Sequence, residues 1–129
     1  MKEAYVNYEI AKLLKEKGFD EYCFAFWEYE LYEYSLYITG YPIINSELEK
    51  EMVDGCSAPT HQMTMAWLRE KGIYITIIYG DYPANKKVFW TPQIDSLEGF
   101  DLPDSFYQEY NLYEDAVEAA IKYCLENLI

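Results

Sequence analysis

Basic residues are scarce in this sequence, and two long stretches contain none at all. The 129 residues include ten Lys and Arg together and one His, against 23 Asp and Glu, which gives a net charge of -13. No Lys, Arg or His lies between Lys17 and Lys50 or between Lys87 and Lys122, and fifteen of the acidic residues fall in these two stretches. Proteins bind nucleic-acid phosphates largely through Lys and Arg, so this composition argues against direct binding of DNA or RNA.

Cysteine, histidine and long apolar runs are also in short supply. The three cysteines, Cys23, Cys56 and Cys124, form no CxxC pair. With a single His besides, they do not supply the ligands of a structural zinc site, and we expect neither a metal nor a cofactor. No apolar run approaches the roughly 18 residues that span a membrane, and residues 1–7 do not resemble a signal peptide. We therefore expect a cytoplasmic protein with reduced thiols.

What is present is a mixture of helical and strand patterns, with 24 aromatic residues among the side chains that could build a core. Of the 129 residues, 51% are apolar and fifteen are Tyr, which is not the composition of a disordered acidic tail. Apolar periodicity predicts helices over residues 7–17, 57–71 and 113–128, strands over 22–29, 32–38, 73–79 and 86–91, and loops over 45–55 and 95–110. This order, α-β-β-α-β-β-α, predicts an α+β fold. We expect one two-layer domain over residues 1–129, with helices on one face of a mostly antiparallel sheet.

Particular residues set the predicted ends of these elements. Asn7 is a good N-cap for the first helix, and Ser57 or Ala58 is expected to cap the second, with Pro59 in its first turn. Pro92 is expected to end the fourth strand, and Asn111 to cap the last helix. The turn between the first two strands carries no Asn-Gly or Asp-Gly, so its geometry is not predicted.

Three blocks of the sequence resemble a known group of proteins. They are the end of the first helix at Lys17-Gly18-Phe19, the block Cys56-Ser57-Ala58-Pro59-Thr60 followed by Trp67-Leu68-Arg69-Glu70-Lys71 and Ile73-Tyr74-Ile75, and the closing stretch from Tyr113 to Ile121. Together they cover about half of the chain and are similar to short uncharacterised proteins encoded by gut Bacteroidales and their phages. The strongly aromatic and acidic residues 22–54 depart from that pattern. The resemblance implies a small intracellular accessory protein of mobile-element origin, and it transfers no catalytic residue.

Two groups of residues are candidates for chemistry or binding. Cys56 precedes a predicted helix and His61 lies in its first turn, but no third residue is identifiable to orient the His, so we expect both to be structural and the protein not to be an enzyme. The second group is the candidate partner-binding segment, in which large aromatic side chains alternate with Glu. Its residues are Trp27, Glu28, Tyr29, Glu30, Tyr32 and Glu33.

The leading functional hypothesis is a non-catalytic interaction protein whose acidic and aromatic residues bind a basic protein surface. An inhibitor that imitates nucleic acid is one form of it, since the acidity is confined to particular stretches of the chain. The alternative from another class is a small-ligand module that stacks a nucleotide or sugar on Trp27, Trp90 or nearby Tyr residues. A third interpretation is that the charge only keeps a Tyr-rich surface soluble. The aromatic hairpin is also a candidate surface for forming a homo-oligomer.

Overall fold

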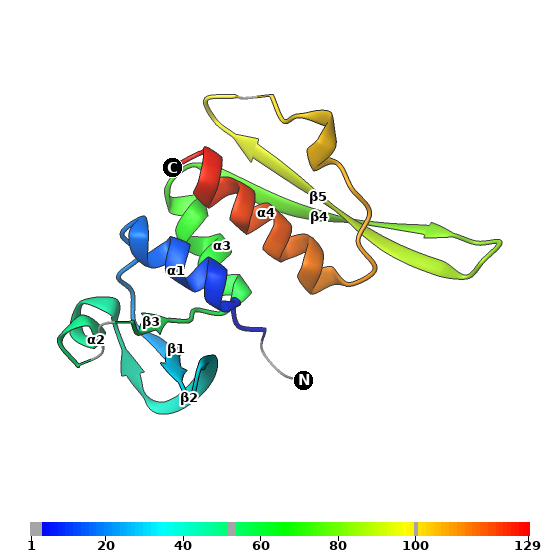
Figure 1. Ribbon diagram of the computed structural model, residues 1–129. Coiled ribbons are helices and arrows are strands. Elements are labelled where there is room, and N and C mark those ends of the chain that lie inside the picture. The colour runs from blue at the N-terminus through cyan, green and yellow to red at the C-terminus, as the bar shows by residue number, and fades with distance from the viewer. Residues whose placement is uncertain (1–3, 52–53, 100) are drawn as a thin grey trace. The chain divides into compact units, whose positions relative to one another are not determined.

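The protein has an α+β fold, as the sequence predicts. The computed structural model describes residues 4–51, 54–99 and 101–129 (Figure 1). The chain divides into two compact units: unit 1 holds the described residues up to Met63 together with Ile129, and unit 2 runs from Thr64 to Leu128. The predicted order of helices and strands is present, with one further helix, one short strand and one 3-10 turn inserted in it. The expectation of a single domain stays a prediction.

Unit 1 begins with a capped helix that packs on a hairpin. Helix α1 (Tyr8–Glu16) starts where the Asn7 side chain accepts a hydrogen bond from the Ile10 N–H at 2.9 Å, as predicted. It ends just before Gly18, whose φ of +89° suits glycine. The antiparallel strands β1 (Cys23–Glu30) and β2 (Glu33–Ile43) follow. The buried core of this part of the chain includes Val6, Ile10, Leu14, Phe19 and Ala25.

Two further elements complete unit 1. Helix α2 (Asn45–Glu51) places Leu48 against Phe26 and Ile43, while strand β3 (Cys56–Ser57) pairs with the second edge of β1. The buried amide of Asn45 joins these elements. Its Nδ2 donates to the Phe19 carbonyl at 2.8 Å, and its Oδ1 accepts the Ser57 N–H at 2.8 Å.

Unit 2 is a long two-stranded ribbon covered on one side by a helix. It begins within helix α3 (His61–Glu70), of which the residues from Thr64 onward belong to this unit. Strands β4 (Ile73–Tyr82) and β5 (Lys87–Ser96) follow and pair antiparallel over their whole length. Helix α4 (Tyr113–Asn127) packs on the ribbon (Figure 1), and a 3-10 turn, η1 (Asp104–Phe106), precedes it. Ile73, Pro92 and Ile94 are buried on the ribbon face that also carries Trp90, which packs against Tyr113 of α4.

The prediction of one sheet with helices on one face is wrong. In the described part of the chain the strands form two sheets, ordered β2-β1-β3 and β4-β5. Since β2 and β3 take both edges of β1, no edge of that strand is left for β4 or β5. Within unit 1, Phe26 packs with Leu48 of α2 while its neighbour Trp27 meets Tyr8 of α1. Adjacent strand residues point to opposite faces, so these two helices lie on opposite faces of the sheet.

Contacts between residues far apart in the sequence explain why some helices begin or end elsewhere than predicted. Residues 45–51 are helical rather than a loop, because Leu48 and Asn45 are held by distant partners; residues 52 and 53 of that predicted loop lie outside the described residues. Ser57 and Ala58 do not cap α3, since both pair with β1, and the Thr60 hydroxyl caps it instead by accepting the Met63 N–H at 3.2 Å.

The ends of the last strand and last helix also differ from prediction. Pro92 lies inside β5, opposite Ile77, instead of ending the strand, so Asp95 and Ser96 are strand residues rather than loop; residue 100 of that predicted loop lies outside the described residues. Leu112, not Asn111, occupies the N-cap position of α4 and makes no side-chain capping bond there. The two acidic residues in the first turn, Glu114 and Asp115, favour the helix start through its dipole.

Candidate interaction surface

The β1–β2 hairpin sorts the predicted partner-binding residues onto opposite faces. Successive side chains of a strand point to opposite sides of the sheet, so Trp27 and Tyr29 share one face of β1 while Glu28 and Glu30 share the other. Across the ladder Glu30 lies opposite Glu33, which places Glu33 on the face of Glu28 and Glu30. We call these three glutamates the acidic face of the hairpin. Tyr32 belongs to neither face, because it lies in the turn.

The aromatic face is largely engaged inside unit 1. The Trp27 Nε1 donates to the Val6 carbonyl at 2.9 Å, and its ring meets Tyr8 edge-on with 6.5 Å between centroids. Tyr8 in turn stacks on Tyr34 at 3.6 Å, and Tyr34 contacts Tyr29 at 4.9 Å. Trp27 is therefore a packing residue that ties the hairpin to α1, whereas Tyr29 and Tyr34 on the same face remain exposed, at 46% and 39%.

On the acidic face, the ionised form of one carboxylate, Glu28, is disfavoured by its surroundings. Partial desolvation raises the pKa of Glu28, and the charge of Glu30 and a hydrogen bond with it raise that pKa further. The Tyr37 hydroxyl donates to Glu30, and this bond is the main cause of the raised pKa of Tyr37. Glu30 also faces Glu33 directly across the ladder, where like charges are destabilising. No Lys, Arg or His occurs anywhere in residues 18–49 to offset these charges from within the hairpin.

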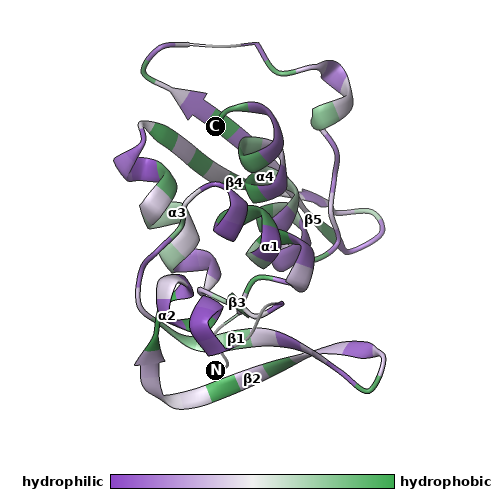
Figure 2. Cartoon of the chain, turned by 60° about the vertical axis from the view of Figure 1, so that its left-hand side comes forward, coloured by the Kyte–Doolittle hydropathy of each residue, from purple (hydrophilic) through white to green (hydrophobic). Residues whose placement is uncertain are grey.

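The hairpin turns through two residues that are costly in this conformation. Leu31 and Tyr32 both have positive φ, 50° and 66°, as in a type I′ turn, which normally uses Asn-Gly. Their side chains are 92% and 93% exposed. Figure 2 shows strongly hydrophilic residues beside this turn. We call Glu28–Glu33 the hairpin end.

The structure thus brings together part of the predicted site and adds one residue. Glu28, Glu30, Tyr32 and Glu33 gather at the hairpin end, whereas Trp27 is packed beneath α1. Leu31 was not predicted as a site residue, because an apolar side chain between two strand patterns normally belongs to a core. The signal that identifies it is the absence of Asn or Gly between residues 29 and 34, which forces large side chains into the turn.

Trp90, the other predicted stacking residue, is packed in unit 2. Its ring meets Tyr79 edge-on at 5.7 Å and Tyr113 edge-on at 5.3 Å. Its backbone exchanges two hydrogen bonds of 2.8 Å with Tyr110. Trp90 is therefore a half-buried packing residue, and its contacts with Tyr79 and Tyr113 leave less of the ring for a base or a sugar.

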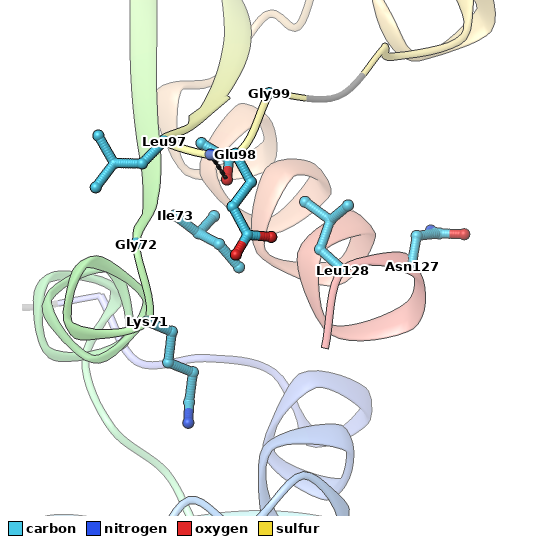
Figure 3. A pocket seen from close by; sticks show the side chains of 9 residues that line it. Lys71, Gly72, Ile73, Leu97, Glu98, Gly99, Asn127 and Leu128 are labelled. Atoms are coloured by element: carbon cyan, nitrogen blue, oxygen red, sulfur yellow. Dashed lines mark hydrogen bonds between the residues drawn. The ribbon is translucent and has the colours of Figure 1, made fainter.

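Of the cavities in the described part of the chain, three have a lining that includes neither Trp27 nor Trp90. The first, about 410 Å³, lies between the start of β4, the turn after β5 and the end of α4 (Figure 3). There the Glu98 N–H donates to the Ser96 hydroxyl at 3.3 Å, which fixes the turn. A second, about 280 Å³, lies beside the packed rings of Phe106 and Tyr123. Each of these two cavities has one Lys and one Glu in its lining, an arrangement without strong preference for either charge.

The third cavity, about 330 Å³, is lined in part by one of the three cysteines. Its lining includes Cys56 of β3, with Lys12 and Lys15 on α1. Burial raises the pKa of the Cys56 thiol, and the two lysines offset this only in part. Cys56 therefore lacks the low pKa of a nucleophilic thiol, and it lies in a strand rather than at a helix start. Cys23, Cys124 and His61 are buried, as predicted.

The described residues contain neither a metal-binding cluster nor a membrane-spanning helix. Among residues 4–51, 54–99 and 101–129, no three His, Cys, Asp or Glu gather closely enough to hold a metal ion. Over the same ranges, every helix falls short of the length and apolar character that a membrane crossing requires. Comparisons with protein-family models, with curated proteins and with solved structures give no match for this chain.

Proposed function

We propose that this protein binds the basic surface of a partner protein through the hairpin end, without catalysing a reaction. The observation that carries the proposal is the juxtaposition of Glu30 and Glu33 across the last pair of the ladder, beside two exposed apolar side chains in the turn. Like charges placed opposite each other in a sheet destabilise it. A cationic partner would remove that cost on binding.

The turn adds a second cost that has no compensation within the hairpin. A non-glycine residue with positive φ is strained by about 1–2 kcal/mol, and here two such residues are adjacent. Both side chains point almost entirely into solvent, so burial does not repay the strain. Local features that lower stability without evident compensation are concentrated at functional sites.

The chemistry of the hairpin end specifies what the partner surface must offer. Three carboxylates on one face match a group of Lys or Arg side chains, with Arg able to bind a carboxylate through two hydrogen bonds. Leu31 and Tyr32 require an apolar recess next to those cations. A nucleic-acid-binding cleft has the necessary positive charge, so an inhibitor that occupies such a cleft is the specific form of the proposal.

The test begins with a tagged pull-down from lysate, washed in parallel at low and high salt and read by mass spectrometry. We expect a stoichiometric partner that is lost at high salt, because exposed charge pairs are screened. Its Kd is then measured for a variant carrying Glu28→Lys, Glu30→Lys and Glu33→Lys. The expected result is a loss of affinity of at least about 100-fold, chiefly through slower association.

The matched control changes the net charge equally but elsewhere. It carries Asp95→Lys, Glu98→Lys and Asp101→Lys, three exposed positions in unit 2. We expect this variant to lose much less affinity than the hairpin variant. Equal losses would show that only total charge matters and would remove the hairpin end as the site. Binding that is unchanged in high salt would contradict the electrostatic basis of the proposal.

A further inference from the structure

Strand β4 has one edge that no other strand of the described chain covers. The sheet of unit 2 contains only β4 and β5 among the described residues, and its ladder runs without interruption from Ile73–Ser96 to Tyr82–Lys87. The ribbon is visible in Figure 1, where β4 and β5 lie side by side along their whole length. A strand at a sheet edge presents unpaired N–H and C=O groups to whatever approaches it.

The direction of those groups follows from the contacts of β5. Trp90 uses both its N–H and its C=O to bond Tyr110, so these groups point away from β4. In an antiparallel ladder, a residue and the one directly opposite it both point their backbone groups inward or both outward, in alternation along the strands. Tyr79 lies opposite Trp90 and must therefore point its N–H and C=O toward the outer edge of β4.

Pro92 supports the same assignment independently. Proline has no N–H and is tolerated in a strand where that group would face away from the ladder. Pro92 is two residues from Trp90 and lies opposite Ile77, so the alternation gives it this outward position. The same alternation continues along the uninterrupted ladder. It gives outward N–H and C=O groups to the odd-numbered residues of β4, which are Ile73, Ile75, Ile77 and Tyr79.

This edge lacks the features by which natural proteins prevent an edge strand from pairing with another chain. From Ile73 to Gly80 the strand contains no charged residue, no Pro and no bulge, and it is rich in β-branched and aromatic side chains. The outer edge of β5 is different, because it carries Pro92 and is partly covered by Tyr110. An uncharged, regular edge of this length is suited to pairing with another strand.

We propose that a second copy of this chain pairs with β4 along this edge, forming a four-stranded antiparallel sheet across a two-fold axis. The strand is self-complementary in the register centred on Thr76. In that register Ile73 lies opposite Tyr79 of the partner subunit, so the outward backbone groups of both strands meet as hydrogen-bonded pairs. This register, unlike its neighbours, places the exposed Tyr74 opposite Ile78 of the partner subunit.

The exposed side chains of β4 fit the same register. On the face of the ribbon opposite α4, Tyr74 and Ile78 are 38% and 45% exposed. Tyr74 would lie opposite Ile78 of the partner subunit, and aromatic–β-branched pairs of this kind stabilise a sheet. Each copy carries a charge of -13, so the two copies repel each other at long range. Salt should therefore strengthen this association, whereas it weakens the partner binding proposed above.

The first test uses sedimentation velocity of the full chain over a concentration series at moderate salt. We expect a monomer–dimer equilibrium. Thr76→Lys places two like charges face to face on the two-fold axis and should weaken the dimer by at least about tenfold. Gln93→Lys is the matched control, since Gln93 lies opposite Thr76 on the same face but on β5, away from the seam. A chain that stays monomeric, or a dimer unaffected by Thr76→Lys, overturns the proposal.

The second test examines the register and the backbone groups. Tyr74→Glu and Ile78→Lys should each weaken the dimer, and the double variant should restore it, because the introduced opposite charges then face each other in this register. Amide hydrogen exchange should slow on dimerisation at Ile73, Ile75, Ile77 and Tyr79, while the alternate residues are already protected by β5. A dimer that leaves these four amides exchanging rapidly, or protection that appears only with an added extended peptide, overturns pairing with a second copy.

Discussion

The ring of Phe89 lies directly over Gly80, its opposite residue in the β4–β5 ladder. A Cβ added to Gly80 would overlap the far side of this ring. The ring also contacts Tyr82, with 4.9 Å between centroids, so the two aromatic side chains cover the bare backbone of the glycine. Gly80 is needed here for this close approach and not for an unusual φ, since its φ lies outside the positive region.

Gly80→Ala should therefore destabilise the ribbon. The ring must rotate away and lose its contact with Tyr82, which we expect to cost about 1 kcal/mol, the lower end of the usual cost of overpacking. Urea denaturation followed by circular dichroism measures this change. Gly40→Ala is the control, because nothing lies within 4 Å of a Cβ there and its φ is not positive. Equal effects of the two substitutions would show that the Phe89 ring does not constrain position 80.

Asn45→Ala should be among the most destabilising single substitutions in unit 1. It leaves the Phe19 carbonyl and the Ser57 N–H without their partner, and both bonds are buried. Orphaned buried polar groups cost about 1–3 kcal/mol each, so we expect a loss of about 2–4 kcal/mol in the free energy of unfolding. Asn127→Ala, which removes an exposed bond to the Tyr123 carbonyl, should change it by less than about 0.5 kcal/mol. Similar losses for both would contradict the bridging role of Asn45.

Replacing Leu31-Tyr32 with Asn-Gly should make the protein more stable and weaken its binding. Asn-Gly is the preferred pair for a type I′ turn, so relief of backbone strain should raise the free energy of unfolding by about 1–2 kcal/mol. The same change removes the two side chains offered to an apolar recess. Thermal denaturation and the Kd for the captured partner are the two measurements. A variant that gains stability and binds unchanged would leave the glutamates alone to account for binding.

Stability should fall in alkali because of the buried thiols. Burial raises the pKa of Cys23 to about 11 and that of Cys124 to about 12, above the 9.0 of an exposed thiol. The folded protein holds these protons where the unfolded chain has lost them. Each thiol therefore contributes stability that is present below pH 9 and is lost, at about 1.4 kcal/mol per pH unit, as pH rises toward the folded pKa.

Chemical denaturation at several values between pH 8 and pH 11 measures this slope. Cys124→Ala should flatten it by the contribution of one thiol, even though the cavity it leaves lowers stability at every pH. The comparison of slopes separates the thiol from the tyrosines and lysines, which titrate in both proteins. An unchanged slope would mean that Cys124 is accessible to solvent hydroxide in the folded state.

Local signals predicted those elements whose ends are set by their own residues. Asn7 and Gly18 bound α1 as their chemistry requires, and the alternation in β4 persists through Tyr82. The elements that were missed depend on partners far along the chain. Helix α2 forms because Leu48 meets Phe26 and because Asn45 binds Phe19 and Ser57, and nothing in residues 45–51 alone reveals these contacts.

The candidate surface was predictable in its charge but not in its arrangement. The run of alternating Glu and aromatic residues predicts two faces once the register is known, yet the register depends on the turn. A Leu-Tyr pair is a poor sequence signal for a type I′ turn, so Tyr32 was expected in a strand and Leu31 was overlooked. The role of Trp27 as a packing residue follows only from its bond to Val6 and its contact with Tyr8.

The pairing of Trp90 with Tyr110 has a consequence for how this chain can change in length. Because Tyr110 pairs with Trp90 of β5, the segment between Ser96 and Tyr110 is a loop whose two ends are both held at the ribbon. Doubling the length of such a loop costs only about 0.6 kcal/mol of closure entropy. Asp101 is exposed, and among residues 101–106 the first buried one is Phe106. The junction after Asp101 is therefore the place where insertions, natural or engineered, can accumulate without disturbing the ribbon or α4.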